Sequence, residues 1–302
     1  MTVQLNGKVG MSGRFKLTAI KPDGTTRHLA EFDNMILDSG LEFLTADVSP
    51  DPLTYLHIGT SSAPVSPTQS GLQAWSGSSP VVGQGTEIPA QAGVAPDYAY
   101  TRVVFRRIGL GRVFSVSEMG MGPNQHNAQL FCRALVLDDN GEPTTVTVNA
   151  DEVLDVSYTL RMFVDLSDKT AVLHASGVDY TLTVRPARVD RELSRSLLSY
   201  QLFRHASAWV SGAVQPPILA GSFDPSLAVS RERLSNGKDE KGYFVEGRVF
   251  ASLTGGNLSV PIRTVLLLPD AFPAWTVGFE PGVPKTASEI FSVTLRIYFG
   301  RR

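Results

Sequence analysis

The sequence predicts a mainly β protein made of two tandem, related antiparallel β-sandwich-like domains, each with one short helix and long excursion loops. Three observations lead to this fold class. A chain of 302 residues with 42% hydrophobic and 19% charged side chains can form a core in each of two domains. Short runs of alternating apolar and polar residues are separated by turns rich in Gly and Pro. The order of these elements recurs along the chain, and each round ends in a Thr-Leu-Arg strand.

The first element is a hairpin. Phe15, Leu17 and Ala19 alternate with polar neighbours, which is the pattern of a half-buried strand. The KPDGT turn that follows has Pro22 at a position where its fixed φ is favourable, and Gly24 can take a positive φ. The alternation then resumes, so we expect two antiparallel strands.

A short helix and a strand come next. Asp38 or Ser39 can cap the helix, and Leu41 and Leu44 have the i, i+3 spacing of a buried helical face. The apolar run at 55–58 predicts a strand.

Residues 59–97 predict an extended loop or arm. They are rich in Gly, Ser, Pro, Thr and Gln, and they have little periodicity. Compact domains rarely carry such long loops without a use for them, so we expect this arm to become ordered against a neighbouring subunit. Trp75 lies inside it, and two roles stay open: an anchor for a partner, or a side chain packed on its own domain.

Strands return in the second part of this domain. The runs at 101–108 and 112–120 are strand-like, and 127–148 form a hairpin whose DDNG sequence is typical of a type I′ turn. The strand at 154–165 contains TLRMF and closes the first domain.

The second half of the chain repeats this order. A β segment is followed by a predicted helix with Leu193, Leu197, Leu198 and Leu202 on one stripe, a short strand, and an excursion at 211–241. The run at 260–277 matches the 127–148 hairpin at an offset of 130 residues, and the final TLRIYF strand matches TLRMF at an offset of 135. We therefore expect a β-domain 1 at 1–166 and a β-domain 2 at 167–302.

The charge and the termini restrict the class of protein. The net charge of −2 and the pI near 6.2 do not fit a nucleic-acid-binding surface. Residues 1–166 carry 11 basic and 17 acidic side chains, and 167–302 carry 16 and 12, an asymmetry that suits head-to-tail packing of subunits. The chain has no apolar run of membrane-spanning length, no signal peptide at its start and a single cysteine, so we expect synthesis in a reducing cytoplasm.

No pattern in the chain predicts a catalytic, cofactor or metal site. The five histidines lack metal-ligand spacing, and the GLGRVF run at 109–114 lacks the third glycine of a dinucleotide-binding turn. Cys132 lies on a strand and is expected to be a buried, inert thiol. The carboxylates and amide of the 138–142 turn could in principle bind calcium, but they lack the EF-hand spacing and a plain hairpin turn accounts for them; Asp165 and Asp168 predict a linker turn. Paired carboxylates for glycoside hydrolysis are a spatial feature that sequence does not reveal.

Two stretches resemble structural proteins of tailed bacteriophages. A segment of the form F-x-N-x-I-x-x-x-G-L precedes one with G-T, Pro and Leu at set positions. Downstream, S-E-x-G-x-G, L-F-x-R-A-L, G-x-P-T-T-x-T-V and D-E-x-L-x-V-x-Y-x-L-R continue the pattern. The matching positions of the first two segments are Phe32, Asn34, Ile36, Gly40, Leu41, Gly59, Thr60, Pro64 and Leu72.

The resemblance covers about residues 30–165 and implies a non-enzymatic virion component, made in the bacterial cytoplasm, in the tail, baseplate or fibre-attachment region. Its implied partners are other virion proteins and copies of itself, with a host surface as a further partner; nucleic acid, membrane, cofactor and metal are not expected. The alternatives are a receptor- or glycan-binding module, a neck, collar or head-decoration protein, and a glycan hydrolase.

Overall fold

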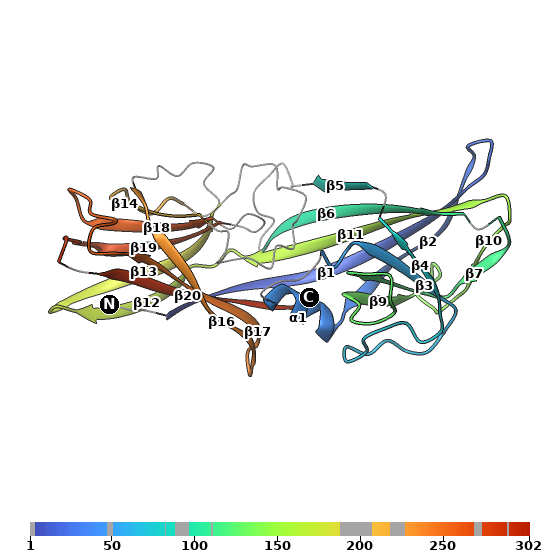
Figure 1. The fold of residues 1–302 in the computed structure, drawn as a ribbon, viewed down its shortest axis with the longest axis horizontal. Coiled ribbons are helices and arrows are strands. Elements are labelled where there is room, and N and C mark those ends of the chain that lie inside the picture. Colours follow the sequence, from blue (N-terminus) through green and yellow to red (C-terminus); the bar gives the residue numbers. More distant parts are fainter. Residues whose placement is uncertain are drawn as a thin grey trace. The chain divides into compact units, whose positions relative to one another are not determined.

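The computed structural model describes residues 4–46, 51–81, 83–87, 97–109, 111–187, 207–217, 227–268, 274–288 and 290–302 (Figure 1). The first elements are β1 (Gln4–Ile20), β2 (Thr26–Ile36), α1 (Asp38–Thr45), β3 (Tyr55–Gly59), β4 (Trp75–Pro80), β5 (Gly83–Glu87), β6 (Asp97–Ile108), β7 (Phe114–Val116), β8 (Glu118–Gly122), β9 (Cys132–Leu135), β10 (Val146–Val148) and β11 (Val153–Asp165). The remaining elements are β12 (Lys169–Ala175), β13 (Val178–Ala187), β14 (Ser207–Ser211), β15 (Leu227–Ala228), β16 (Ser230–Asp239), β17 (Gly242–Ala251), β18 (Ile262–Leu268), β19 (Ala274–Val283) and β20 (Phe291–Arg301).

The predicted fold class is confirmed: the chain is mainly β, and every strand pair of described register is antiparallel. The chain divides into two compact units. Unit 1 comprises Met1–Val9, Pro89–Ala99 and Phe163–Gly300, and unit 2 comprises Gly10–Ile88, Tyr100–Met162 and Arg301–Arg302. The chain passes from unit 2 to unit 1 between residues 162 and 163. The first nine residues belong to unit 1, together with most of the second half of the chain. The descent of the two halves from one repeated domain stays a prediction.

Unit 2 is built around the long hairpin of β1 and β2. Strand β11 pairs with β1 and β6 with β11, while β9, β8, β3 and β4 extend the sheet in that order from β2. The turn of the hairpin is the predicted one: Gly24 has a φ of 84°, and Lys21 N–H donates to Thr25 O. The described register of the hairpin runs from Gly13 opposite Asn34 to Ile20 opposite Thr26.

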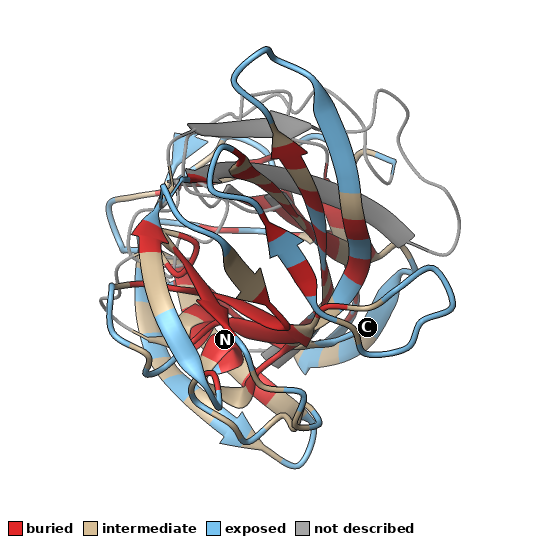
Figure 2. Cartoon of the chain, turned by 90° about the vertical axis from the view of Figure 1, so that its right-hand side faces the viewer, coloured by how far each residue is buried: buried red, intermediate tan, exposed pale blue. Residues whose placement is uncertain are grey.

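The core of unit 2 follows the two-residue period of its strands. On β1, every second residue from Met11 to Ala19 is buried, and on β11 every second residue from Leu154 to Met162 is buried. Figure 2 shows strands on which buried residues alternate with less buried ones. The Phe15 ring lies 4.7 Å from that of Tyr158 and 5.8 Å from that of Phe32, between centroids, so the two strands that flank β1 meet at this side chain.

The predicted hairpin at 127–148 differs from the prediction in its turn type and in the strand that its second arm pairs with. Within 138–142, Gly141 has positive φ but its neighbours do not, and Gly141 N–H donates to Asp138 O. This is a type I turn closed by a glycine bulge, because a type I′ turn needs two residues with positive φ. After the turn, β10 pairs with β7 and not with β9.

Unit 1 is a β-sandwich. One sheet contains β16, β17, β20 and the start of β1, and the other contains β12, β13, β19, β18, β14 and β15 in that order. The Phe279 ring of β19 meets the Phe291 ring of β20 edge to face at 5.5 Å, and Trp275 packs against the backbone of Gly7. Both contacts join the two sheets through their inner faces.

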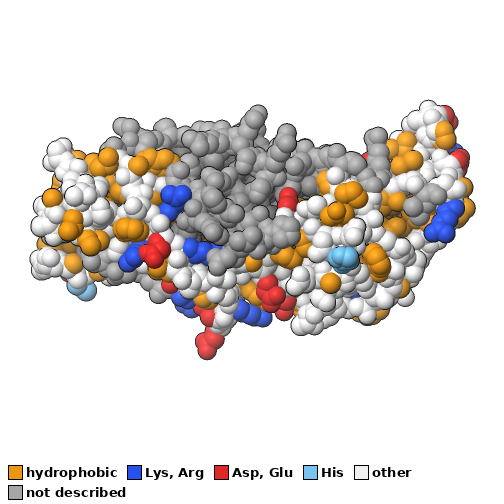
Figure 3. Space-filling model, viewed as in Figure 1, with side chains coloured by type: hydrophobic (Ala, Val, Ile, Leu, Met, Phe, Trp, Pro, Cys, Tyr) orange, Lys and Arg blue, Asp and Glu red, His pale blue; other side chains and the backbone are white. Residues whose placement is uncertain are grey.

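The predicted excursion at 211–241 contains a strand that hydrophobic periodicity missed. Strand β16 is ten residues long and pairs with β17 through nine of them, yet it holds almost no apolar side chains. Polar pairs hold it in place: Arg248 binds Glu232, and Ser235 donates to Glu246. Figure 3 shows acidic and basic side chains next to one another over this hairpin, with acidic ones at its tip.

The two Thr-Leu-Arg strands, β11 and β20, both pair with β1 but differ in their surroundings. Leu160 and Leu295 are buried at equivalent positions. Arg296 stacks its guanidinium 4.1 Å from the centre of the Phe244 ring, whereas Arg161 is exposed. Strand β20 is buried on both faces over most of its length, whereas one face of β11 stays partly open.

The predicted helix of the second half falls in 190–206, which lies outside the described residues. Among the residues that are described, no helix has the length and apolar character of a membrane span.

Candidate functional site

Strand β8 carries the S-E-x-G-x-G motif on two contrasting faces. Met119 and Met121 point into the core on one face and are fully buried. Gly120 and Gly122 leave the other face without side chains, and a Cβ added at either would lie within 3.0 Å of Leu130. The glycines therefore let another segment of chain approach the strand closely.

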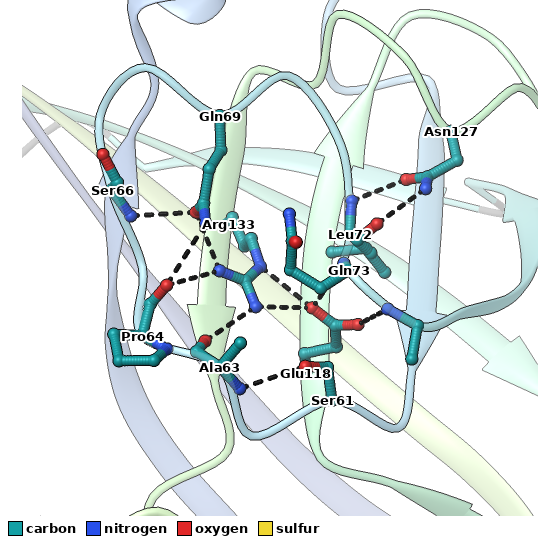
Figure 4. A network of polar contacts seen from close by, with 11 residues as sticks. Ser61, Ala63, Pro64, Ser66, Gln69, Leu72, Gln73, Glu118, Asn127 and Arg133 are labelled. Carbon is teal, nitrogen blue, oxygen red and sulfur yellow. Dashed lines mark hydrogen bonds and ion pairs between the residues drawn. The ribbon is translucent and has the colours of Figure 1, made fainter.

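The segment that covers this face is 60–74, the first part of the predicted arm (Figure 4). Two charged side chains lie beneath it, Glu118 on β8 and Arg133 on β9. Arg133 stands opposite Gly120, so Glu118 is its diagonal neighbour on the same face. Both side chains are 0% exposed, and Arg133 Nη2 lies 2.7 Å from Glu118 Oε2.

All five N–H groups of Arg133 have an acceptor. Nε and Nη2 donate to Glu118, Nη1 donates to Pro64 O (3.1 Å) and Gln69 Oε1 (2.8 Å), and the second Nη2 proton goes to Ala63 O (2.9 Å). A guanidinium holds its five donors in one plane, so Arg133 fixes the loop at Ala63, Pro64 and Gln69.

The carboxylate of Glu118 is equally engaged. Besides Arg133, its oxygens accept from the backbone N–H groups of Gln73 (3.1 Å) and Ala74 (2.6 Å). A buried ion pair is tolerated when its remaining donors and acceptors are satisfied in this way. Neither group has a free lone pair or proton directed at solvent, so the pair is suited to holding the loop and not to proton transfer.

The other end of the loop is tied by an amide. Asn127 Oδ1 accepts from Leu72 N–H (2.6 Å) and its Nδ2 donates to Leu72 O (2.8 Å), as a neighbouring strand would. The Leu72 side chain joins Leu37 and Leu130 in a buried apolar cluster. The loop is thus pinned by an ion pair at one end and by a strand-like contact at the other.

His57 of β3 lies near the same glycine face and is 0% exposed. Its Nε2 is 3.0 Å from Asn124 O, an acceptor, so the proton lies on Nε2 and Nδ1 is a buried lone pair without a partner. Burial lowers the pKa of His57 to about 4, because a second proton on Nδ1 would be a buried charge without an acceptor.

Helix α1 is packed against the same region. A Cβ at Gly40 would overlap Phe131 O, so this motif glycine is required by close approach and not by its φ. The predicted caps are wrong: the N-cap residue is Leu37, and Ser39 Oγ instead donates to Leu130 O (2.6 Å). The predicted buried face of Leu41 and Leu44 is confirmed.

Two further motif residues, Asn34 and Tyr158, lie next to the single cysteine. Asn34 Nδ2 donates to the Tyr158 hydroxyl (3.0 Å) beside Cys132, which is fully buried as expected. Burial raises the pKa of the Cys132 thiol to about 12 and raises that of Tyr158 well above its ordinary value. A thiol held neutral in this way is a packing group and not a nucleophile.

The other candidate residues lie apart. Asp138 accepts from the N–H groups of Asn140 and Glu142, which accounts for its carboxylate as part of a hairpin turn. Asp165 and Asp168 form the turn between β11 and β12, where each binds a cation of unit 1. In the part of the chain that the structure describes, no three His, Cys, Asp or Glu side chains gather as a metal site would require.

The predicted arm is corrected in its first part. Residues 60–74 are bound to their own unit, and β4 and β5 continue the chain to residue 87; 88–96 lie outside the described residues. Trp75 begins β4 and is 45% exposed, so it is a fixed surface side chain. Hydrophobic periodicity does not reveal this anchoring. The sequence did hold a signal for it, because Glu118 and Arg133 each stand in an otherwise apolar strand, where a charged residue needs a partner.

Comparisons of the chain with protein-family models, with curated proteins and with solved structures gave no match.

Proposed function

We propose that this chain is a non-enzymatic structural component of a tailed-bacteriophage virion, most consistent with the tail, baseplate or fibre-attachment region. The observation that carries the proposal is the place of the residues that resemble the phage pattern. Many of them are buried in unit 2, among them Phe32, Ile36, Leu41, Leu72, Glu118 and Arg133, and the last three contact or belong to the loop at 60–74.

Six of these residues have a clear structural task. Gly40 and Gly59 allow close backbone approach, Leu72 fills an apolar cluster, and Asn34 binds Tyr158. The two charges of the motif, Glu118 and Arg133, bind each other and the loop. A pattern whose members specify packing is what a scaffold needs, whereas an enzyme's pattern directs reactive groups into an open cleft.

The loop network suits a protein that has to keep its shape under load within an assembly. A surface loop held by a buried ion pair and a strand-like amide loses little further entropy when a neighbour packs on it. Trp75, fixed next to this loop and 45% exposed, gives such a neighbour an aromatic side chain to cover.

The test is a nonsense mutation in the gene within the phage or prophage that carries it. Particles from a suppressor host and from a non-suppressor host are purified by density gradient and compared by electron microscopy and peptide mass spectrometry. We expect the chain to be present in several copies per wild-type particle, and particles without it to be incomplete at one end. Complete, infectious particles that lack the chain would exclude the proposal.

The same particles separate the alternatives. Complete particles that fail to adsorb to cells would indicate the receptor-binding role instead. Localisation by antibody labelling would place the chain at the tail, the collar or the head.

A further inference from the structure

Unit 1 contains a pocket of about 560 Å³ at one edge of its sandwich. It is lined by residues of four segments: the start of β1, the turn from β11 into β12, the turn between β16 and β17, and β20. The volume lies within the range of pockets that hold small organic molecules and is far larger than a single ion needs.

The charge of the lining is positive. Lys8, Lys169 and Lys241 contribute three ammonium groups, and Asp165 contributes one carboxylate. Asp165 is already paired with Lys169 at 2.7 Å. In the described part of the chain no carboxylate lies within ion-pair distance of Lys8 or Lys241, so two ammonium groups are available to a ligand.

The uncharged groups of the lining suit a ligand with hydroxyl groups. Asn6 and Thr170 both donate and accept hydrogen bonds, and the Asp165 carboxylate accepts them. That carboxylate would repel a bare anion but would bind a hydroxyl. The combination therefore favours a molecule that carries one anionic group and several hydroxyls over a free oxyanion.

One wall of the pocket is an aromatic side chain held in a fixed position. Tyr298 is 8% exposed, and its hydroxyl donates to Asp239 (2.9 Å) and lies 3.3 Å from Arg296 Nη1. Arg296 is itself held by Glu246, which stands opposite it on β17. Because Tyr298 is held in this way, this part of the pocket wall needs little side-chain ordering when a ligand binds.

We infer that this pocket binds a carbohydrate that carries a carboxylate or a phosphate group, with Lys8 and Lys241 as the cationic contacts. The inference concerns unit 1 of the isolated chain and does not depend on a role in a virion. The two can therefore fail separately.

The experiment is titration of the purified full-length chain with glucuronate, glucose 6-phosphate, glucose and inorganic phosphate, followed by calorimetry and by amide NMR. Saturable binding of one or both charged sugars is expected, at least about tenfold tighter than that of glucose or phosphate, a difference of about 1.4 kcal/mol. Amide shifts should gather at Lys8, Thr170 and Ala171. The two charged sugars distinguish carboxylate from phosphate as the preferred group.

The variant Lys8→Gln/Lys241→Gln should weaken charged-sugar binding at least about tenfold with unchanged thermal unfolding. The matched control is Lys16→Gln/Lys21→Gln, which removes two exposed lysines of unit 2 and should bind as the wild type does. Raised salt should weaken binding in the wild type. Absence of saturation, equal binding of glucose or of inorganic phosphate, or full binding by the Lys8/Lys241 variant would each overturn the inference.

Discussion

Arg133 and Glu118 are diagonal neighbours on β9 and β8, and neither side chain has exposed surface. Arg133 stands opposite Gly120, where an added Cβ would lie 2.9 Å from Leu130 and 3.4 Å from Leu72 of the loop. The pair connects a local sequence feature, an acid and a base in two apolar strands, to the course of a loop whose bonded residues lie 69 and 70 positions before Arg133 in the chain.

Breaking this pair is expected to be costly. Arg133→Met leaves the Glu118 carboxylate buried without its cation, and we expect a loss of about 3–5 kcal/mol in the free energy of unfolding, measured by urea denaturation. The control is Glu232→Gln, which breaks the exposed pair with Arg248 and should change stability by less than about 1 kcal/mol. A double variant, Arg133→Met/Glu118→Leu, should lose less than the sum of the single losses. An Arg133→Met protein as stable as the control variant would contradict this account.

The loop itself should resist proteolysis in the free protein. Thermolysin cleaves before large apolar residues such as Val65 and Leu72, but both are held by the network around Arg133 and Asn127. We expect wild-type chain to remain uncut within 60–74, and Arg133→Met to be cut there at temperatures where its far-UV circular dichroism is still native. Peptide mass spectrometry locates the cut. Rapid cleavage of the wild type in this loop would show that the segment is ordered only by a neighbour.

Most of the fold could be predicted because its strands obey simple periodicity. The β1–β2 hairpin and its turn follow from Phe15, Leu17 and Gly24, and β11 follows from its alternation. Strand β16 could not be predicted in this way, because it lacks alternating apolar residues and is held by polar pairs with β17. Composition alone predicts a single arm at 59–97. The hydrogen bonds that fix 60–74 come from Glu118 and Arg133, and contacts between residues so far apart in sequence do not produce a periodic pattern.

Gly40→Ala should destabilise the protein although it lies in a helix. In an ordinary helix interior this change stabilises by up to about 1 kcal/mol, because alanine has the higher helix propensity. Here the new Cβ would overlap the backbone oxygen of Phe131, which cannot move without disturbing β9. We expect a net loss of about 1–3 kcal/mol, as for an overpacked core.

The matched control is Gly77→Ala on β4, where a Cβ meets nothing within 4 Å and φ is not positive. Its stability should be equal to or slightly above that of the wild type. Stabilisation by Gly40→Ala would mean that the helix does not lie against Phe131.

Cys132 should be unreactive in the folded protein. Its thiol is fully buried and its pKa is raised to about 12, so the thiolate needed for reaction is scarce at neutral pH. A disulfide reagent at pH 8 should label the native chain only as fast as it opens, and should label it at once in denaturant. A Cys132→Ser/Thr147→Cys variant, with its thiol at an exposed position, should react at once in the native state. Prompt labelling of native Cys132 would contradict the packing of β9.

Stability should fall with acid before the carboxylates titrate. The folded-state pKa of His57 is about 4, against an ordinary 6.5. Below pH 6.5 the unfolded chain therefore binds a proton that the folded chain does not, and stability falls as the pH drops from about 6.5 to about 4. The full shift corresponds to about 3 kcal/mol. The pKa of Asp138 is lowered below 3.8 by the N–H of Glu142, so its effect falls at lower pH.

The measurement is the free energy of unfolding in urea at pH 7 and at pH 5, where His57 alone should account for a difference of about 2 kcal/mol. His57→Gln removes the titrating group and should flatten this difference, even if it lowers stability at both pH values. His126→Gln, at an exposed position, should leave the difference unchanged. Because the test compares slopes and not absolute stabilities, a destabilised His57→Gln protein still decides it: an unchanged slope would mean that His57 takes up its proton in the folded chain and that Nδ1 has an acceptor there.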